Sequence, residues 1–140
     1  MTEITGLGDL ISRVLGHIEN GTYRLGCRES FKRGSANGTV TIGPQKDDPA
    51  EFELRVQMSV MRVPKTRETD LFRRLLQLND QFHGRAAFSL AQDGNVHLNS
   101  ARPIQDLDPS EVVDLVLWTS ALADRFDDVL LTEFGRELAI

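Results

Sequence analysis

Cysteine, tryptophan and tyrosine are scarce in this 140-residue sequence, which has one residue of each. The lone cysteine, Cys27, has no partner for an internal disulfide, and nothing resembles a multi-cysteine metal site. No stretch approaches the roughly 18 consecutive apolar residues of a membrane helix, and the N-terminus lacks the basic start and apolar run of a signal peptide. We therefore expect a water-soluble protein of the cytoplasm, where a single thiol stays reduced.

The composition is otherwise that of an ordinary globular protein, with 40% hydrophobic and 26% charged residues. This balance excludes a disordered chain, and the length predicts a single domain over residues 1–140. The net charge of −5 argues against a protein that coats nucleic acid or an anionic membrane. The charge is uneven, because residues 24–74 sum to +4 and residues 106–140 to −7. Such asymmetry fits two halves that attract each other, a solvated surface or an electrostatic partner surface.

Apolar spacing divides the first half of the chain into helix and strands. Intervals of three and four predict a helix over residues 5–19. Alternation from Tyr23 onward, shared by Leu25 and Cys27, predicts a strand with one buried face, and it resumes over residues 39–42. The clearest strand covers residues 51–63, and its phase slips near Val60 and Met61, which favours a bulge there.

The second half begins with a predicted helix over residues 66–82, capped by Thr66 and ended by His83 and Gly84. Two short strands, residues 86–90 and 96–100, flank Asp93-Gly94, a strong signal for a tight hairpin turn. The stretch from Asp108 to Glu111 resembles a capping box and opens a helix over residues 109–131. The order α-β-β-β-α-β-β-α predicts an α+β fold, with helices on one side of an antiparallel five-stranded sheet.

Side chains that could carry chemistry are few, and each has a simpler structural role. Cys27 lies on the apolar face of the first strand, where a buried thiol is unreactive. His83 suits the end of a helix, and His97 lies on the polar face of a strand. No spacing brings two metal ligands together, and no phosphate-binding glycine loop or activated serine is present. We expect no catalytic residue, no metal site and no cofactor, and hence not an enzyme.

The last helix carries the most informative pattern, because residues 112–118 place apolar side chains nearly all around it. One face can pack on the sheet, and the rest requires the other helices, a second copy of the chain or a bound partner. Internal burial and a partner surface both remain open from the sequence. The residues that we predict for dimer or partner contact lie on the second and last helices: Phe72, Leu76, Val113, Leu117 and Trp118.

One part of the sequence is similar to a known family. The stretches Leu75–Asn79, Gly84–Leu90 and Asp93–Leu98, followed by Leu107 and the capped helix, resemble the C-terminal half of the YbjN-type proteins, relatives of the type III secretion chaperones of the Tir/CesT type in bacteria. The matching positions are mainly core and turn residues, and Asn79 and Gly94 correspond to structural positions. The resemblance implies a small acidic homodimer without catalysis that holds a partner polypeptide or acts as an accessory regulator in secretion or stress.

We therefore expect a chaperone-like homodimer that binds a protein or peptide client and no membrane. A first alternative is a nucleic-acid-associated or sensory regulator that uses the basic segment 24–74, although few exposed aromatics accompany its cations. Its candidate contacts are Arg24, Arg28, Lys32, Arg33, Arg55 and Lys65. A second alternative is a small enzyme with a site formed by His97, His83 or acidic residues that meet in a pocket.

Overall fold

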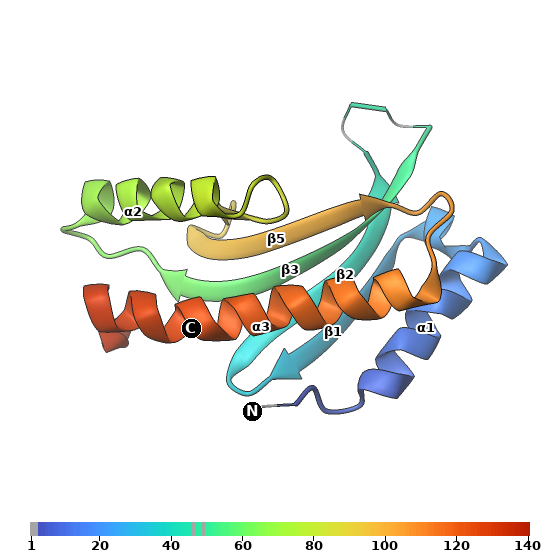
Figure 1. Ribbon diagram of the computed structural model, residues 1–140, viewed down its shortest axis with the longest axis horizontal. Helices are drawn as coiled ribbons and strands as arrows, with labels where there is room; N and C mark the ends of the chain where they lie inside the picture. Colours follow the sequence, from blue (N-terminus) through green and yellow to red (C-terminus); the bar gives the residue numbers. More distant parts are fainter. Residues whose placement is uncertain (1–2, 46, 49) are drawn as a thin grey trace.

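The computed structural model describes residues 3–45, 47, 48 and 50–140. Its elements follow the predicted order, and the α+β class is confirmed (Figure 1). The helices are α1 (Leu7–Asn20), α2 (Glu68–Gln81) and α3 (Pro109–Phe134), with short 3-10 helices η1 (Thr22–Leu25) and η2 (Arg136–Leu138). The strands are β1 (Cys27–Arg33), β2 (Ala36–Pro44), β3 (Phe52–Arg62), β4 (Ala87–Leu90) and β5 (Asn95–Pro103).

The five strands form one sheet in the order β1-β2-β3-β5-β4, with every neighbouring pair antiparallel. The predicted antiparallel five-stranded sheet is thus confirmed. The slip predicted near Val60 is also present, because the β3–β5 register shifts between Ser59 and Met61. The extra residue leaves Val60 and Met61 both buried, which explains the change of parity in the sequence.

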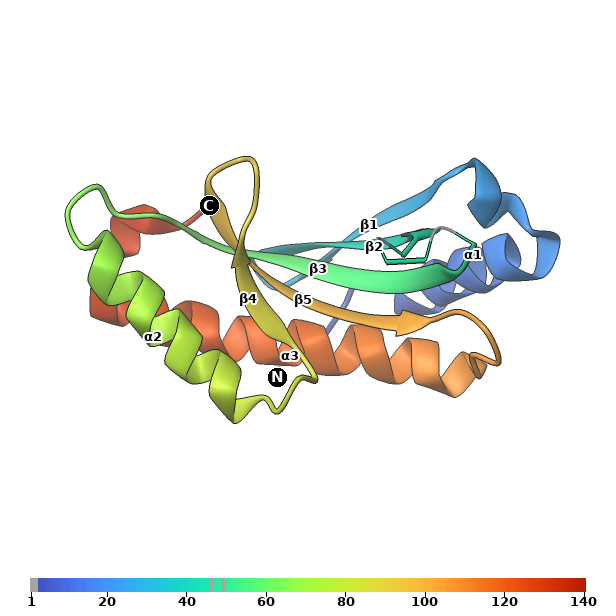
Figure 2. The same ribbon diagram turned by 90° about the horizontal axis from the view of Figure 1, so that it is seen from above.

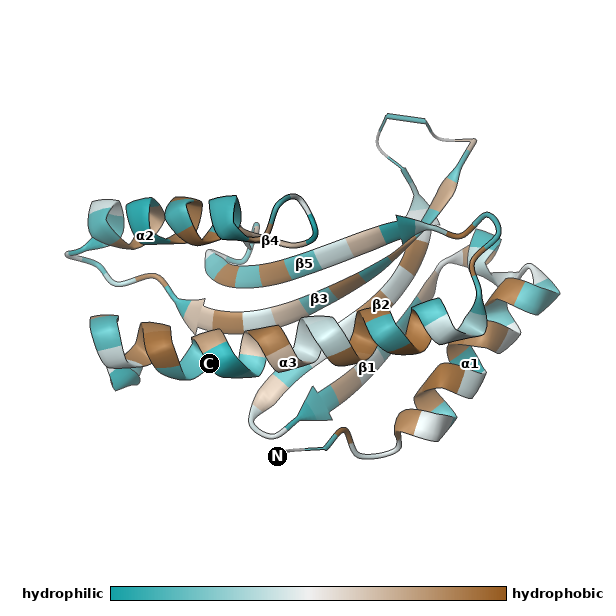
Figure 3. Ribbon diagram, viewed as in Figure 1, coloured by the Kyte–Doolittle hydropathy of each residue, from teal (hydrophilic) through white to brown (hydrophobic). Residues whose placement is uncertain are grey.

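The three helices lie on the same side of the sheet, as Figure 2 shows. Helix α3 crosses β2, β3 and β5, α1 packs against β1, and α2 lies beside β4. The alternation of hydrophobic and hydrophilic bands along β3 and β5 is visible in Figure 3. It gives the sheet one apolar face, which the helices cover, and one polar face that carries no helix, which we call the open face.

The core lies between the covered face and the helices. Fully buried side chains of the sheet include Val40, Leu54, Val56, Met58 and Leu98, and those of α3 include Val112, Val116 and Leu130. Burial of one such side chain contributes about 1.5–3 kcal/mol relative to exposure. The backbone of Gly38 also lies in this core, where an added Cβ would stand within 3 Å of Met58 and Phe31.

The strand predicted from Tyr23 begins later than expected, because residues 22–25 form η1. Leu25 is 90% exposed rather than buried, and the chain turns at Gly26, with φ of 92°, before β1 starts at Cys27. Tyr23 instead packs edge-to-face on Phe52, with 5.0 Å between ring centroids. The alternation of Tyr23 and Leu25 therefore does not mark a strand, because no neighbouring strand pairs with these residues.

Of the caps predicted at the starts of two helices, one is confirmed and one is wrong. Asp108 caps α3 as expected, and its carboxylate accepts a hydrogen bond of 2.8 Å from the Ser110 backbone N–H. The second half of the capping box is not formed, because Glu111 pairs with Arg102 at 2.8 Å. The predicted Thr66 cap is wrong: α2 begins at Glu68, and Arg67 precedes it without a capping side-chain bond.

Candidate functional site

The outer face of α2, a shallow surface widely open to solvent and formed by this helix alone, contains two of the residues predicted for partner contact. Leu76 is 69% exposed, and half-buried Phe72 lies one turn before it. We call this surface the α2 groove. Its lining residues are Thr69, Phe72, Arg73, Arg74, Leu76, Gln77, Asp80 and Gln81. The groove thus combines an apolar centre with charges of both signs.

The inner face of α2 fixes the groove to the rest of the protein. It buries Leu71, Leu75 and Leu78. Arg74 forms a bidentate ion pair with Glu133 of α3, with N···O distances of 3.1 and 3.0 Å. The Asn79 amide binds the backbone of Phe88 in β4, accepting from its N–H at 2.7 Å and donating to its carbonyl at 3.2 Å. Asn79 therefore has the structural role that the sequence assigned to it.

The other three predicted contact residues lie on α3 and are half-buried. Val113, Leu117 and Trp118 all pack against the hydrophobic core, and the guanidinium of Arg85 lies 4.0 Å from the centre of the Trp118 ring. None of the three lines the α2 groove. The structure therefore places the five predicted residues on two helices without joining them into one surface.

The cations of the basic segment are dispersed rather than gathered into one patch. Arg28 and Lys32 project from β1 on the open face, whereas Arg33 is buried on the covered face, where it donates to the Leu117 carbonyl at 2.9 Å. Arg55 pairs with Glu53 at 2.8 Å, and Arg24 lies over the Tyr23 ring. The sixth predicted cation, Lys65, is exposed in the loop before α2.

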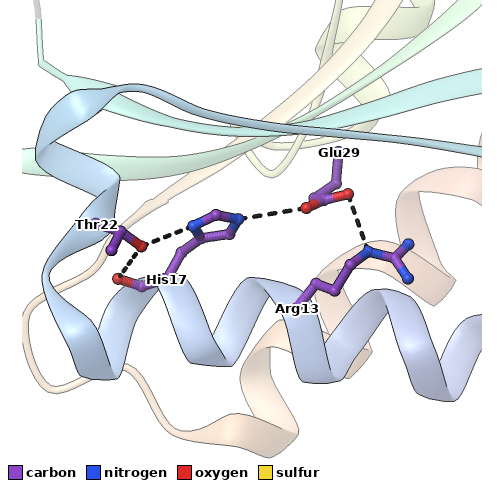
Figure 4. Close-up of polar contacts among 4 residues, drawn as sticks. All are labelled: Arg13, His17, Thr22 and Glu29. Atoms are coloured by element: carbon purple, nitrogen blue, oxygen red, sulfur yellow. Dashed lines mark hydrogen bonds and ion pairs between the residues drawn. The ribbon is translucent and has the colours of Figure 1, made fainter.

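A polar cluster joins α1 to the covered face of β1, as Figure 4 shows. Glu29 accepts from Arg13 at 3.0 Å and lies 3.3 Å from His17 Nε2, while His17 Nδ1 lies 2.8 Å from the Thr22 hydroxyl. When Nε2 donates to Glu29, Nδ1 accepts from Thr22. The order hydroxyl, imidazole and carboxylate is that of a catalytic relay. Here Arg13 balances the charge of Glu29, and the contacts attach the helix to the strand.

The remaining candidates for chemistry lie apart from one another. Cys27 is buried, and burial together with the charge of Glu29 raises the pKa of its thiol, so it stays protonated. His83 adopts a positive φ of 52° just after α2 and is exposed. His97 is buried on the open face, and its Nε2 lies 3.1 Å from the Asp93 carboxylate. Among residues 3–45, 47, 48 and 50–140, no group of three His, Cys, Asp or Glu is placed to hold a metal ion.

Comparisons with known proteins identify the fold. No protein-family model matches the sequence, and no curated protein matches it either. Among solved structures, a chain in the crystal structure of the ExsC–ExsE complex matches with a TM-score of 0.59 and 14% sequence identity. The match covers 86% of this chain and 96% of that chain. This chain therefore shares its fold with that solved chain. In the described part of this fold, no helix is both long enough and apolar enough to cross a membrane.

Sequence reasoning missed the arrangement of the open face, where β1, β2, β3 and β5 bring polar residues together. The register places Thr39 beside Gln57 and Ser59 beside His97. The polar parity of each strand was visible in the sequence, but the register that aligns these residues across strands was not. The sequence located the turn that contains Asp93, but it did not show that the turn bends toward His97.

Proposed function

We propose that the protein is a non-catalytic, homodimeric, chaperone-like binding protein of the YbjN type, which holds a partner polypeptide in the cytoplasm. The observation that carries the proposal is the exposed apolar centre of the α2 groove, on a fold shared with a chain of the ExsC–ExsE complex. The solved chain is part of a two-protein complex, and the proposal extends protein binding to this one.

The charges around Leu76 support pairing of α2 with a second copy of itself. In a two-fold symmetric, antiparallel helix pair, residue i of one copy faces residue j of the other when both are equally far from the axis. An axis between Leu76 and Gln77 places Arg73 of one copy opposite Asp80 of the other, and both are exposed. The same axis places each Leu76 opposite Gln77 of the other copy, so the two Leu76 side chains lie next to each other at the centre. The apolar centre and both charged pairs are then satisfied by one symmetric contact.

The dimer is tested by replacing Leu76 with aspartate, because two like charges would then meet at the axis. A matched control is Leu25→Asp, since Leu25 is 90% exposed on η1 and lies outside the groove. Light scattering at tens of micromolar should give a dimer for the parent and for Leu25→Asp, and a monomer for Leu76→Asp. A monomeric parent, or a dimeric Leu76→Asp variant, would show that α2 does not form the interface.

Client binding is tested separately on α3. Trp118→Glu should lose a specific polypeptide that the parent captures from the host's lysate, as identified by mass spectrometry. The control Trp118→Phe keeps an aromatic ring for Arg85 to stack on and should retain the polypeptide. Unchanged capture by Trp118→Glu would place Trp118 outside the client surface, and a parent that captures no polypeptide would contradict client binding.

A further inference from the structure

A hollow of about 420 Å³ lies on the open face, on the side of the sheet opposite the helices. It extends across β1, β2, β3 and β5, and the turn between β4 and β5 forms part of its wall. Figure 2 shows this turn rising on the side of the sheet that carries no helix. The hollow and the α2 groove have no lining residue in common. Any ligand that it binds is therefore separate from the proposed dimer contact.

Most of the residues that line the hollow have polar side chains, although apolar atoms make up slightly more than half of its accessible surface. Hydroxyl and amide side chains come from three neighbouring strands: Ser30, Asn37, Thr39, Gln57 and Ser59. Phe31 also borders the hollow, although its position in β1 has the parity of buried Cys27 and faces the helices. The hydroxyl and amide groups can hydrogen-bond the hydroxyls of a ligand.

Two cations stand on one side of the hollow, across from Asp93 on the other. Arg28 and Lys32 are exposed on β1, and neither forms an ion pair with any residue that the structure describes. The nearby Arg55 differs, because Glu53 neutralises it at 2.8 Å. Arg28 and Lys32 occupy the outward positions on either side of Ser30 in β1. Their long side chains could both reach an oxyanion near Ser30, which accepts charge-assisted hydrogen bonds from a guanidinium and an ammonium.

The opposite wall contains a polar side chain that burial leaves incompletely satisfied. His97 is 7% exposed, its Nε2 lies 3.1 Å from Asp93, and its buried Nδ1 has no partner among the described residues. The Asn95 backbone N–H and His97 lower the pKa of Asp93, so its carboxylate stays ionised and accepts from Nε2–H. Nδ1 is then an acceptor that needs a donor. On the same face, the buried Asn99 Oδ1 also lacks a donor among the described residues.

We propose that this hollow binds a small phosphorylated polyol of the sugar-phosphate class. Arg28 and Lys32 hold the phosphate, and Thr39, Gln57 and the other polar groups bind the hydroxyls. His97, fixed by Asp93, forms the wall on the β5 side. This inference does not depend on the proposed function.

Binding is measured by NMR titration of the full chain with glucose 6-phosphate, glucose and inorganic phosphate in parallel. Glucose 6-phosphate should shift backbone amide signals of residues 28–39 and 93–97 in a saturable way by about 10 mM, whereas glucose should not. Inorganic phosphate should bind at least several-fold more weakly, because it lacks the hydroxyls. Equal binding of inorganic phosphate, or no saturable shift with glucose 6-phosphate, would overturn the proposal.

Charge variants test the phosphate subsite. The double variant Arg28→Gln/Lys32→Gln should weaken glucose 6-phosphate binding roughly tenfold or more. The control Arg24→Gln/Lys65→Gln removes the same net charge from exposed positions outside the hollow and should bind like the parent. Equal weakening of binding in both double variants would mean that only the overall charge of the protein matters. That result would contradict a phosphate subsite at Arg28 and Lys32.

A further variant tests the hydroxyl subsite without altering charge or shape. Thr39→Val keeps the branched side chain in β2 and should weaken glucose 6-phosphate more than inorganic phosphate, by roughly threefold to tenfold. Leu76→Asp should bind glucose 6-phosphate like the parent, which separates this test from that of the dimer. If an acidic peptide shifts the same amide signals and glucose 6-phosphate does not, the proposal is wrong and the hollow binds a protein ligand instead.

Discussion

Helices α2 and α3 use their apolar residues in different ways. Residues 112–118 of α3 are apolar nearly all around, yet the sheet and the neighbouring segments bury or half-bury all of their apolar side chains, including Val112 and Val116. Helix α2 is more polar but leaves Leu76 69% exposed at the centre of a groove. The comparison shows that the number of apolar residues on a helix does not indicate which helix has a face left for a partner. The position of the helix decides it: α3 crosses the middle of the sheet, and α2 lies at its edge.

The largest expected effect is on the free energy of unfolding, when one leucine of α3 and one of α2 are each replaced by alanine. Leu130→Ala should lower the free energy of unfolding by about 2–5 kcal/mol, because it leaves a cavity in the core. Leu76→Ala should change it by no more than about 0.5 kcal/mol in dilute solution. Urea unfolding followed by circular dichroism measures both, and equal losses would show that α2 is covered in the free chain.

A smaller effect is expected where α2 meets the sheet. Asn79→Ala removes both hydrogen bonds to Phe88 and leaves the Phe88 backbone N–H without an acceptor, so stability should fall by about 1–2 kcal/mol. Gln77→Ala, at an exposed position of the same helix, serves as the control and should have little effect. The same unfolding measurement applies, and an unchanged Asn79→Ala variant would mean that the edge position of α2 does not depend on this amide.

The smallest effect concerns charge on α3. Burial, reinforced by the charges of Asp128 and Asp124, raises the pKa of Asp127. The folded state therefore disfavours the ionised carboxylate, which costs stability at neutral pH, and this cost disappears as the pH falls through the raised pKa. Asp127→Asn should stabilise the protein by about 0.5 kcal/mol at pH 7 and give no gain near about pH 3.

The exposed Asp114→Asn is the matched control on α3. Thermal unfolding at the two pH values measures the difference between the variants. A gain from Asp127→Asn that persists at low pH would rule out ionisation of this carboxylate as its cause.

Much of the fold could be predicted because its signals are local. Asp93-Gly94 indicated a hairpin and Asp108 a helix start, since turn and cap geometry depend on a few neighbouring residues. The bulge at Val60 was visible because it reverses the parity of every later residue in the strand. Tyr23 and Leu25 failed as strand residues because alternation has meaning only where a neighbouring strand pairs with it.

The candidate sites were less predictable, because they depend on contacts distant in sequence. Nothing near Trp118 indicated that Arg85 would stack on it. Phe72 and Leu76 were named as contacts, but their degree of exposure depends on how α2 packs against the rest of the protein. The neighbours of His97 on the open face follow from the sheet register. For that reason the sequence listed the histidine but could not place it in a hollow.

Because the Asn79 amide bonds α2 to β4, we expect these two elements to open together in local unfolding. The Phe88 N–H is bonded to a side chain of α2, so it can exchange with solvent only when the helix moves away from the strand. Its hydrogen-exchange rate therefore reports on the docking of α2, even though the residue lies in a strand. A contact made at Leu76 would stabilise the docked helix and slow hydrogen exchange at the Phe88 amide. Exchange at this one strand residue could therefore report binding on the outer face of α2.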